Sequence, residues 1–255
     1  MSGGSKELYP EFLDFMVGCG ALLFGDFTLK SGRKSPYFIN TGEYKTGWQL
    51  SRLGDFYKKL IQNSVRPVGS AGKVDEALSE EEMASINESI SSKFNVLFGP
   101  AYKGIPLVTA TAAKLASSGL DLKVSFDRKE RKDHGEGEFI LGYYPQPGDR
   151  IAIIEDVTTA GTSVKEIVEL LNELKTGASV VSLYISVDRM ERGSDNRTAI
   201  IQLKEEYGID VYPIATVENI IEYLEDTPAN CKPVYNSKVY AHNIREYLNK
   251  YGPTE

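Results

Sequence analysis

The chain has 255 residues, of which 41% are hydrophobic and 25% charged, and its formal net charge is −7 with a sequence pI of about 5.1. The composition is ordinary for a globular protein, and the acidic total argues against general binding of nucleic acid or of anionic membranes. The two cysteines lack metal or redox spacing, no apolar run approaches the roughly 20 residues of a membrane span, and the N-terminus lacks a signal-peptide pattern, so we expect a soluble cytoplasmic protein.

Helical and strand patterns follow one another from the N-terminus. Apolar residues at helical spacing predict a helix from Leu8 to about Gly18 or Gly20. Glycine and proline then punctuate short β-like runs in residues 27–40, which predicts a loop and a pair of strands. Residues 48–61 predict a second helix.

Residues 69–93 differ in composition, because they are rich in Ser, Glu and Ala and hold no aromatic side chain. Ser79 and Glu82 form a capping-box pattern at a helix start. A thin apolar stripe follows at Leu78, Met83, Ile86 and Ile90. We expect an inserted surface segment with one short helix, which is either a solvated appendage, the favoured interpretation, or a partner-binding element.

Beyond this segment, short apolar runs alternate with helical patterns. Strands are expected at residues 96–98, 123–126, 151–154, 180–187 and 211–216. Helices are expected at residues 106–117, 163–175, 197–207 and 240–251. This alternation predicts an α/β fold with a mostly parallel sheet flanked by helices.

The strand predicted at 151–154 runs into two acids, Glu155 and Asp156, and then into a hydroxyl-rich loop before a helix. Backbone N–H groups at a helix N-terminus attract phosphate, and Gly161 permits close approach of the backbone. The acids would repel a phosphate, so we expect them to accept hydrogen bonds from sugar hydroxyls. A capped strand–loop–helix with surface acids is the disfavoured alternative. The predicted phosphate contacts are Val157, Thr158, Thr159, Ala160, Gly161, Thr162 and Ser163.

A second anion loop is predicted at residues 98–104, FGPAYKG, which also lies between a strand and a helix. Its glycines, the cation of Lys103 and the amides of the helix start suit another anionic group. The alternative interpretation is an ordinary turn with an exposed lysine.

Residues 128–137, RKERKDHGEG, form a basic cluster in an otherwise acidic chain. Gly135 and Gly137 would let this stretch close as a lid, so that its cations shield a departing diphosphate and stabilise the transition state more than the ground state. A solvated charged face is the alternative.

These motifs carry a resemblance. The 151–163 stretch resembles the PRPP-binding motif of type I phosphoribosyltransferases, and it is not a Walker loop, because GxxxxGK[ST] is absent. The lid is similar to the mobile loop of orotate phosphoribosyltransferases, residues 24–40 resemble their N-terminal hood, and residues 186–193 resemble their base-binding segment.

The resemblance implies a Mg²⁺-dependent enzyme that converts orotate and PRPP to orotidine 5′-monophosphate and pyrophosphate in de novo pyrimidine biosynthesis. It implies one domain over 1–255, with a hood from about 1–45 plus the C-terminal segment. It further implies a homodimer that shares the mobile loop, and a cis peptide bond between Ala101 and Tyr102. Mg²⁺ would be held mainly by PRPP and water.

The resemblance also assigns site residues. The catalytic positions are Lys103, Lys129, Lys132, His134 and Asp156. The PRPP-binding positions are Lys30, Tyr102, Lys103, Arg128, Lys129, Lys132, His134, Glu155, Asp156 and the whole of the 157–163 loop. The orotate-binding positions are Lys30, Phe38, Ile39, Thr159 and Arg189, although the family commonly has Phe where Ile39 stands.

Two other functions remain open from the sequence. A purine phosphoribosyltransferase would share the PRPP motif, but the hood and Arg189 argue against it. A PRPP-sensing regulator without catalysis could keep the phosphate loop, but it would be free to lose the lid cations that this chain retains.

Overall fold

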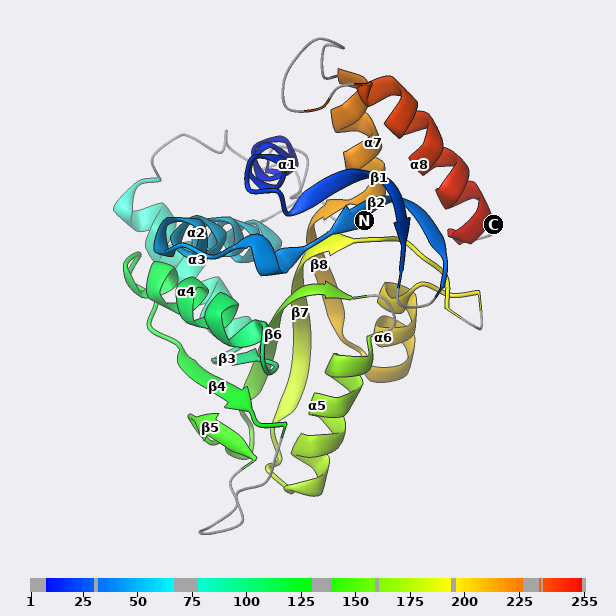
Figure 1. Cartoon of the computed structure of the whole chain (residues 1–255). Coiled ribbons are helices and arrows are strands. Elements are labelled where there is room, and N and C mark those ends of the chain that lie inside the picture. The colour runs from blue at the N-terminus through cyan, green and yellow to red at the C-terminus, as the bar shows by residue number, and fades with distance from the viewer. Residues whose placement is uncertain are drawn as a thin grey trace.

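The computed structural model describes residues 8–29, 32–66, 78–129, 139–158, 161–193, 196–226, 234 and 236–253. Its centre is a six-stranded sheet in the order β5-β4-β3-β6-β7-β8, and a separate two-stranded sheet is formed by β1 and β2 (Figure 1). The strands are β1 (Leu22–Thr28), β2 (Lys34–Ile39), β3 (Val96–Gly99), β4 (Lys123–Asp127), β5 (Ile140–Gly142), β6 (Arg150–Thr158), β7 (Ser179–Asp188) and β8 (Asp210–Thr216). The helices are α1 (Tyr9–Gly18), the 3-10 turn η1 (Thr41–Glu43), α2 (Gly47–Ser64), α3 (Glu80–Lys93), α4 (Gly104–Ala116), α5 (Thr162–Glu173), α6 (Ala199–Tyr207), α7 (Val217–Asp226) and α8 (Ser237–Tyr251).

The mostly parallel sheet expected from the sequence is confirmed. Strands β4, β3, β6, β7 and β8 pair in parallel, and only the short β5 runs antiparallel, at the edge beside β4. Three elements were not expected from the sequence: β5, α7 and η1. Parallel strands place their carboxyl ends along one edge of the sheet, which is where open α/β folds bind ligands.

Alternation along β6 divides the interior into two packed layers. Ala152 and Ile154 join the core formed with α1, α2, α4, α7 and α8, whereas Ile151 and Ile153 join the core formed with α5 and α6. Figure 1 shows α2 and α4 on one side of the sheet and α5 and α6 on the other. Successive side chains of a strand point to opposite faces, so the same alternation decides where the acids of β6 point.

Strand β6 continues four residues beyond its expected end at 154. Glu155, Val157 and Thr158 remain in register with Ile185, Val187 and Asp188 of β7, because β7 is also long enough to pair with them. The acids therefore lie on the strand itself and not in the loop after it. Glu155 turns toward α5, and Asp156 turns toward α2 and α4.

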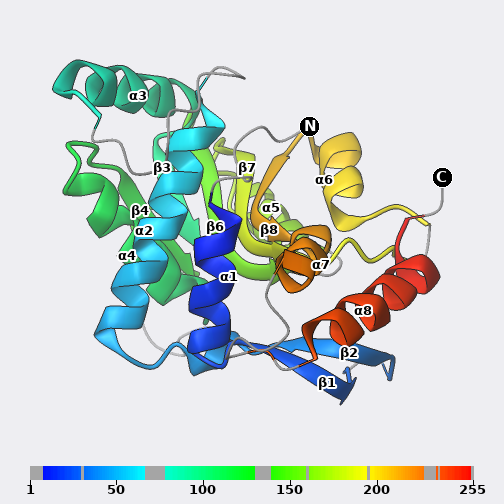
Figure 2. The same cartoon turned by 90° about the horizontal axis from the view of Figure 1, so that it is seen from above.

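The two-stranded sheet packs with the C-terminal helix. Figure 2 shows α8 lying along β1 and β2, at one end of the molecule. Tyr37 of β2 meets Tyr247 of α8 edge to face, with 6.1 Å between ring centroids. This arrangement places the end of β2 above the carboxyl ends of the central strands.

Helix α3, in the compositionally distinct segment, begins with the expected capping box. The Ser79 hydroxyl accepts from the Glu82 amide, and the Glu82 carboxylate accepts from the Ser79 amide at 2.8 Å. Most of the helix is exposed, but Ile90 is fully buried in the core with α2. Among the helices within the described ranges, none is both long and apolar enough to cross a membrane.

Candidate active site

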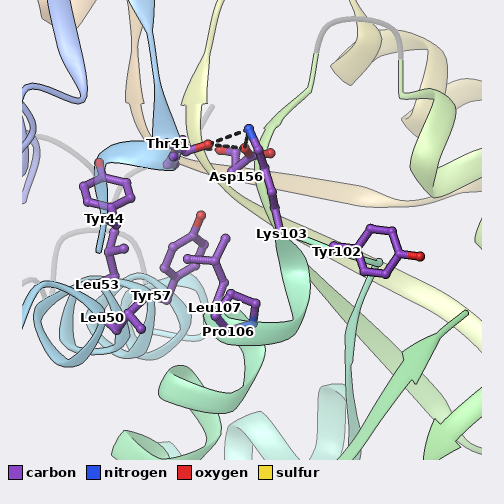
Figure 3. A pocket seen from close by; sticks show the side chains of 12 residues that line it. Thr41, Tyr44, Leu50, Leu53, Tyr57, Tyr102, Lys103, Pro106, Leu107 and Asp156 are labelled. Atoms are coloured by element: carbon purple, nitrogen blue, oxygen red, sulfur yellow. Dashed lines mark hydrogen bonds and ion pairs between the residues drawn. The ribbon is translucent and has the colours of Figure 1, made fainter. Parts of the chain in front are cut away.

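Three segments meet at the carboxyl edge of the sheet: the loop after β3, the end of β6 and the turn after β2. The loop supplies Lys103, β6 supplies Asp156, and η1 supplies Thr41. Figure 3 shows the three side chains pointing toward one another. The structure therefore brings together two of the residues expected to contact PRPP, with a third that the sequence analysis did not single out.

Hydrogen bonds fix the Asp156 carboxylate from several directions. Its Oδ2 accepts from the Thr41 hydroxyl at 2.5 Å and from Lys103 Nζ at 3.2 Å, while Lys103 Nζ also donates to Thr41 Oγ1 at 2.9 Å. Its Oδ1 accepts the Val157 amide at 2.8 Å. The Asp156 side chain is 13% exposed and that of Lys103 is 64% exposed, so a buried anion faces a solvated cation.

A cavity of about 250 Å³ opens beside this group, between α2 and α4. Its upper rim is polar and its walls are mostly apolar (Figure 3). The lining residues are Thr41, Gly42, Tyr44, Leu50, Leu53, Tyr57, Tyr102, Lys103, Pro106, Leu107, Asp156 and Ser186. Apolar walls with a few convergent polar groups are typical of a small-molecule site.

Glu155, on the opposite face of β6, is held by the first turn of α5. Ser163 Oγ lies 2.8 and 2.7 Å from the two carboxylate oxygens of Glu155. Burial raises the pKa of Glu155 to about 7, and the nearby charge of Asp156 raises it too, whereas the Ser163 hydrogen bond and Lys129 oppose the shift. The carboxyl can therefore exchange a proton near neutral pH.

The predicted phosphate loop leads into α5. Gly161 is the N-cap residue of that helix, with left-handed backbone angles (φ 66°, ψ 15°), and an added Cβ would lie 3.2 Å from Leu203. Thr162 and Ser163 follow in the first turn, where free backbone amides favour an anion. Thr159 and Ala160 lie outside the described residues.

The loop after β3 has the expected cis peptide bond between Ala101 and Tyr102. The Ala101 amide donates to Asp127 at the end of β4. Two glycines let the loop turn tightly, because a Cβ on Gly99 would lie 2.5 Å from the Gly104 carbonyl oxygen, and a Cβ on Gly104 would lie 2.7 Å from a Pro100 carbon. Tyr102 is exposed at the tip.

The basic cluster begins where β4 ends. Lys129 Nζ lies 3.2 Å from Glu166 of α5 and 3.9 Å from Asp127. The Arg128 amide donates to the Phe139 carbonyl oxygen, while its buried Nε finds no hydrogen-bond partner in the described part of the chain. Lys132 and His134 lie outside the described residues.

Arg189 lies just after β7, in a buried network beneath the hood. Its guanidinium nitrogens lie 2.6 and 2.8 Å from Glu191 Oε1, and the group sits 4.6 Å above the ring of Tyr37. Tyr247 of α8 donates to the same Glu191 oxygen at 2.9 Å, and Arg33 lies 3.2 Å from the other oxygen. Arg189, a predicted base contact, therefore packs against Tyr37 of the hood strand β2.

The other predicted base contacts are on β2 or outside the described residues. Phe38 stacks on Phe27 with 5.5 Å between centroids, and Ile39 packs against the main core. Lys30 and Thr159 are not among the described residues.

Sequence reasoning missed Thr41, Tyr57 and Glu191. The Tyr57 hydroxyl of α2 donates to the Glu155 carbonyl oxygen at 2.5 Å, which ties α2 to the strand that carries both acids. The sequence shows only that Thr41 carries a hydroxyl directly after a predicted hood strand. That position does not indicate which residue the hydroxyl contacts. Glu191 stands in the segment that resembles a base-binding motif, so that resemblance could have suggested it.

Comparison with known proteins agrees with this geometry. A family model described as a phosphoribosyl transferase domain matches residues 74–216. The fold and the site thus define a phosphoribosyltransferase. An orotate phosphoribosyltransferase of Lachnoclostridium phytofermentans is 42% identical over 97% of this chain and 98% of its own length, and one of Clostridium botulinum is 40% identical over 95% and 96%. The chain belongs to the orotate phosphoribosyltransferase family.

A solved structure supports the assignment. The orotate phosphoribosyltransferase of Francisella tularensis is 32% identical, with a TM-score of 0.71 over 95% of this chain and 99% of that one. The parallel sheet with its small N-terminal hood is therefore the family fold.

Proposed function

We propose that the chain transfers the phosphoribosyl group of PRPP to orotate, giving orotidine 5′-monophosphate and pyrophosphate in de novo pyrimidine biosynthesis. The bond between the anomeric carbon and the diphosphate oxygen breaks as an orotate nitrogen bonds to that carbon. The observation that carries the proposal is the contact of Asp156 with Lys103 at the end of β6, the strand that leads into α5. PRPP carries a phosphate, a ribose and a diphosphate, so its site needs an anion site on each side of a hydroxyl acceptor.

The sugar phosphate would lie along the carboxyl edge of the sheet. Its 5-phosphate would contact residues 157–163, which run from the end of β6 into the first turn of α5, where amides and hydroxyl groups favour an anion. Its ribose hydroxyls would donate to Asp156 and Glu155. Its diphosphate would contact Lys103 and Tyr102 of the loop after β3.

The lid cations would complete the diphosphate site. Lys129 now makes an exposed ion pair with Glu166, and such pairs contribute about 0–1 kcal/mol, so little opposes their exchange for a diphosphate. Arg128 lies beside it, and the resemblance adds Lys132 and His134. Charge brought to the leaving group on closure lowers the barrier more than it strengthens ground-state binding.

The base would bind between the hood and Arg189. An arginine fork suits the carboxylate or a ring carbonyl of orotate. Tyr37 and Glu191 already orient that guanidinium, which leaves Phe38 and Ile39 to contact the ring, with Lys30 and Thr159 added by resemblance.

The residues fit a Mg²⁺ ion that is carried by the substrate. In the part of the chain that the structure describes, no three His, Cys, Asp or Glu side chains gather as a metal cage. The oxygens of Asp156 and Glu155 are nevertheless hard ligands of the kind that Mg²⁺ accepts directly or through water. When bound, the ion would offset negative charge on the diphosphate.

Assembly as a homodimer, with loop 128–137 serving the neighbouring subunit, is part of the proposal and rests on the resemblance. The exposed aromatic side chain of Trp48 offers surface for such an interface. Sedimentation velocity would test it. The cytoplasmic location stays a prediction from the sequence.

The function is tested by mixing the protein with PRPP, Mg²⁺ and orotate and following the loss of orotate absorbance. Adenine, hypoxanthine and guanine serve as competing bases. We expect PRPP-dependent consumption of orotate alone. Turnover of a purine base would indicate a purine phosphoribosyltransferase. PRPP binding without turnover of any base would indicate a PRPP-sensing regulator.

A further inference from the structure

The Thr41 hydroxyl has a forced direction. An ionised carboxylate only accepts hydrogen bonds and an ammonium group only donates them. Thr41 lies 2.5 Å from Asp156 Oδ2 and 2.9 Å from Lys103 Nζ, so its proton must point to Asp156 while its oxygen accepts from Lys103. The three groups form a directed chain from Lys103 through Thr41 to Asp156 (Figure 3).

The acceptor capacity of Asp156 is nearly filled in this arrangement. A carboxylate offers about four lone-pair positions. The Val157 amide, the Thr41 hydroxyl and Lys103 occupy three of them. With Lys103 in place, one position on Asp156 is left for a ribose hydroxyl, and a second position opens once Lys103 leaves. The diphosphate of the same substrate gives the departing ammonium group a new partner.

Thr41 also links two parts of the site. It lies in η1, two residues after Ile39, the last residue of the hood strand β2. Asp156 lies 115 positions later in the sequence, on β6. Three groups donate to the Asp156 carboxylate: the Val157 amide, the Thr41 hydroxyl and Lys103. When Lys103 moves to the diphosphate, Thr41 is the side chain of this set that still orients the carboxylate.

We propose that Thr41 is a positioning residue for the sugar diphosphate: its hydroxyl fixes Asp156 and holds Lys103 beside it until PRPP takes Lys103 over. The proposal rests on the function proposed above and adds a residue to it. Thr41 acts through Asp156 and Lys103. Loss of the Thr41 hydroxyl therefore destabilises the PRPP complex more than the free protein, because in the complex Lys103 no longer donates to Asp156.

The test compares Thr41→Val, which keeps the shape and removes the hydroxyl, with Thr41→Ser, which keeps the hydroxyl. Thr109→Val on the exposed face of α4 is the matched control, since within the described residues that hydroxyl bonds to its own helix, at Ile105. Titration calorimetry with PRPP and Mg²⁺ gives the Kd, and steady-state kinetics gives the KM for orotate at saturating PRPP. Thermal unfolding checks the fold, and Thr41→Ala replaces Thr41→Val should the latter not fold.

We expect roughly tenfold weaker PRPP binding in Thr41→Val, the size of one hydrogen bond to a charged group, and recovery to within about threefold in Thr41→Ser. The KM for orotate should stay within about twofold, since a positioning defect confined to the sugar site spares base binding. Wild-type affinity in Thr41→Val, or equal loss in Thr41→Ser, would overturn the inference. Failure of the unmodified chain to bind PRPP or to consume orotate would instead overturn the proposed function, and this inference with it.

Discussion

The Ser163 hydroxyl bridges both carboxylate oxygens of Glu155, at 2.8 and 2.7 Å, so the first turn of α5 is joined directly to the end of β6. The bond crosses the loop that is proposed to hold the 5-phosphate. The carboxylate of Glu155 is thereby bonded to the last residue of that loop, Ser163, at the first turn of α5. Burial nevertheless leaves that acid with a pKa of about 7.

This pKa predicts a pH-dependent loss of stability. Glu155 titrates near 7 when folded, against an ordinary glutamate value of 4.5, so the folded chain keeps a proton that the unfolded chain releases. The contribution of Glu155 is therefore fully present below pH 4.5 and is lost as the pH rises through 7. Glu155→Gln, which mimics the protonated form, should gain roughly 2–3 kcal/mol in free energy of unfolding relative to wild type between pH 4.5 and 8.

Urea unfolding of both proteins at several pH values measures this difference. Glu169→Gln, on the exposed face of α5, is the control and should give a pH profile parallel to that of wild type. A parallel profile for Glu155→Gln as well would show that Glu155 is not protonated in the folded chain at neutral pH.

Helix α3 should contribute to the stability of the whole domain. Ile90 is fully buried against α2, so Ile90→Ala removes methyl groups from a packed core and should cost about 2–5 kcal/mol in free energy of unfolding. Ile201→Ala, on the exposed side of α6, should cost far less. Thermal or urea unfolding compares them, and equal, small losses would mean that the 69–93 segment is a loosely attached appendage.

The sequence of residues 69–93 predicted a helix with a capping box on the surface, but it did not predict that the helix packs into the core. Ser79 and Glu82 are local and could be found from the sequence. The burial of Ile90 depends on α2, which no local pattern reveals. Helix α7 could have been predicted, because Val217, Ile220, Ile221 and Leu224 have helical spacing and are buried. Strand β5 could not, since three residues are too short for a periodic pattern.

The buried pair of Arg189 and Glu191 should be sensitive to loss of either partner. Both side chains are 7% exposed, so Glu191→Ala leaves a buried cation and should cost about 3–5 kcal/mol in free energy of unfolding. The exposed pair of Arg245 and Glu225 offers a control, in which Glu225→Ala should leave the free energy of unfolding nearly unchanged.

Replacing both partners separates stability from binding. The double variant Arg189→Met with Glu191→Leu should recover much of the lost stability, since no charge stays buried. It should still fail to bind orotate tightly, if Arg189 contacts the base. Normal orotate KM in a stable double variant would remove Arg189 from the base site.

The loop after β3 should not tolerate side chains at its close contacts. A Cβ on Gly104 would meet Pro100 and Gly99 at 2.7 and 2.8 Å, so Gly104→Ala should cost about 1–3 kcal/mol and weaken PRPP binding by displacing Lys103. Gly47→Ala at the start of α2 should be close to neutral, because the added Cβ would meet no described atom within 4 Å apart from its chain neighbours and its own helix backbone. Unfolding and PRPP titration of the two variants check both expectations.

The lid prediction comes from the sequence, because Lys132 lies outside the described residues. Lys132→Ala should lower kcat about 100-fold or more while leaving the unfolding midpoint unchanged, since its charge is needed in the transition state. Lys204→Ala, an exposed lysine paired with Asp210, is the control. Unchanged turnover in Lys132→Ala would remove the lid mechanism.

Local motifs predicted the phosphate loop and most of the strands and helices in their order, and the family resemblance implied the cis bond between Ala101 and Tyr102. The contacts between distant segments could not be predicted, because nothing in the residues around Thr41 indicates that it meets Asp156. The same holds for Tyr247, which reaches Glu191 from the C-terminal helix. Such contacts follow from how the hood and α8 pack on the sheet.

The most direct test of the central claim is a crystal structure of the protein with PRPP and Mg²⁺. The account predicts the 5-phosphate at the N-terminus of α5, ribose hydroxyls on Asp156, and Lys103 Nζ moved from Asp156 to the diphosphate. PRPP bound elsewhere, or a ribose that does not contact Asp156, would contradict it.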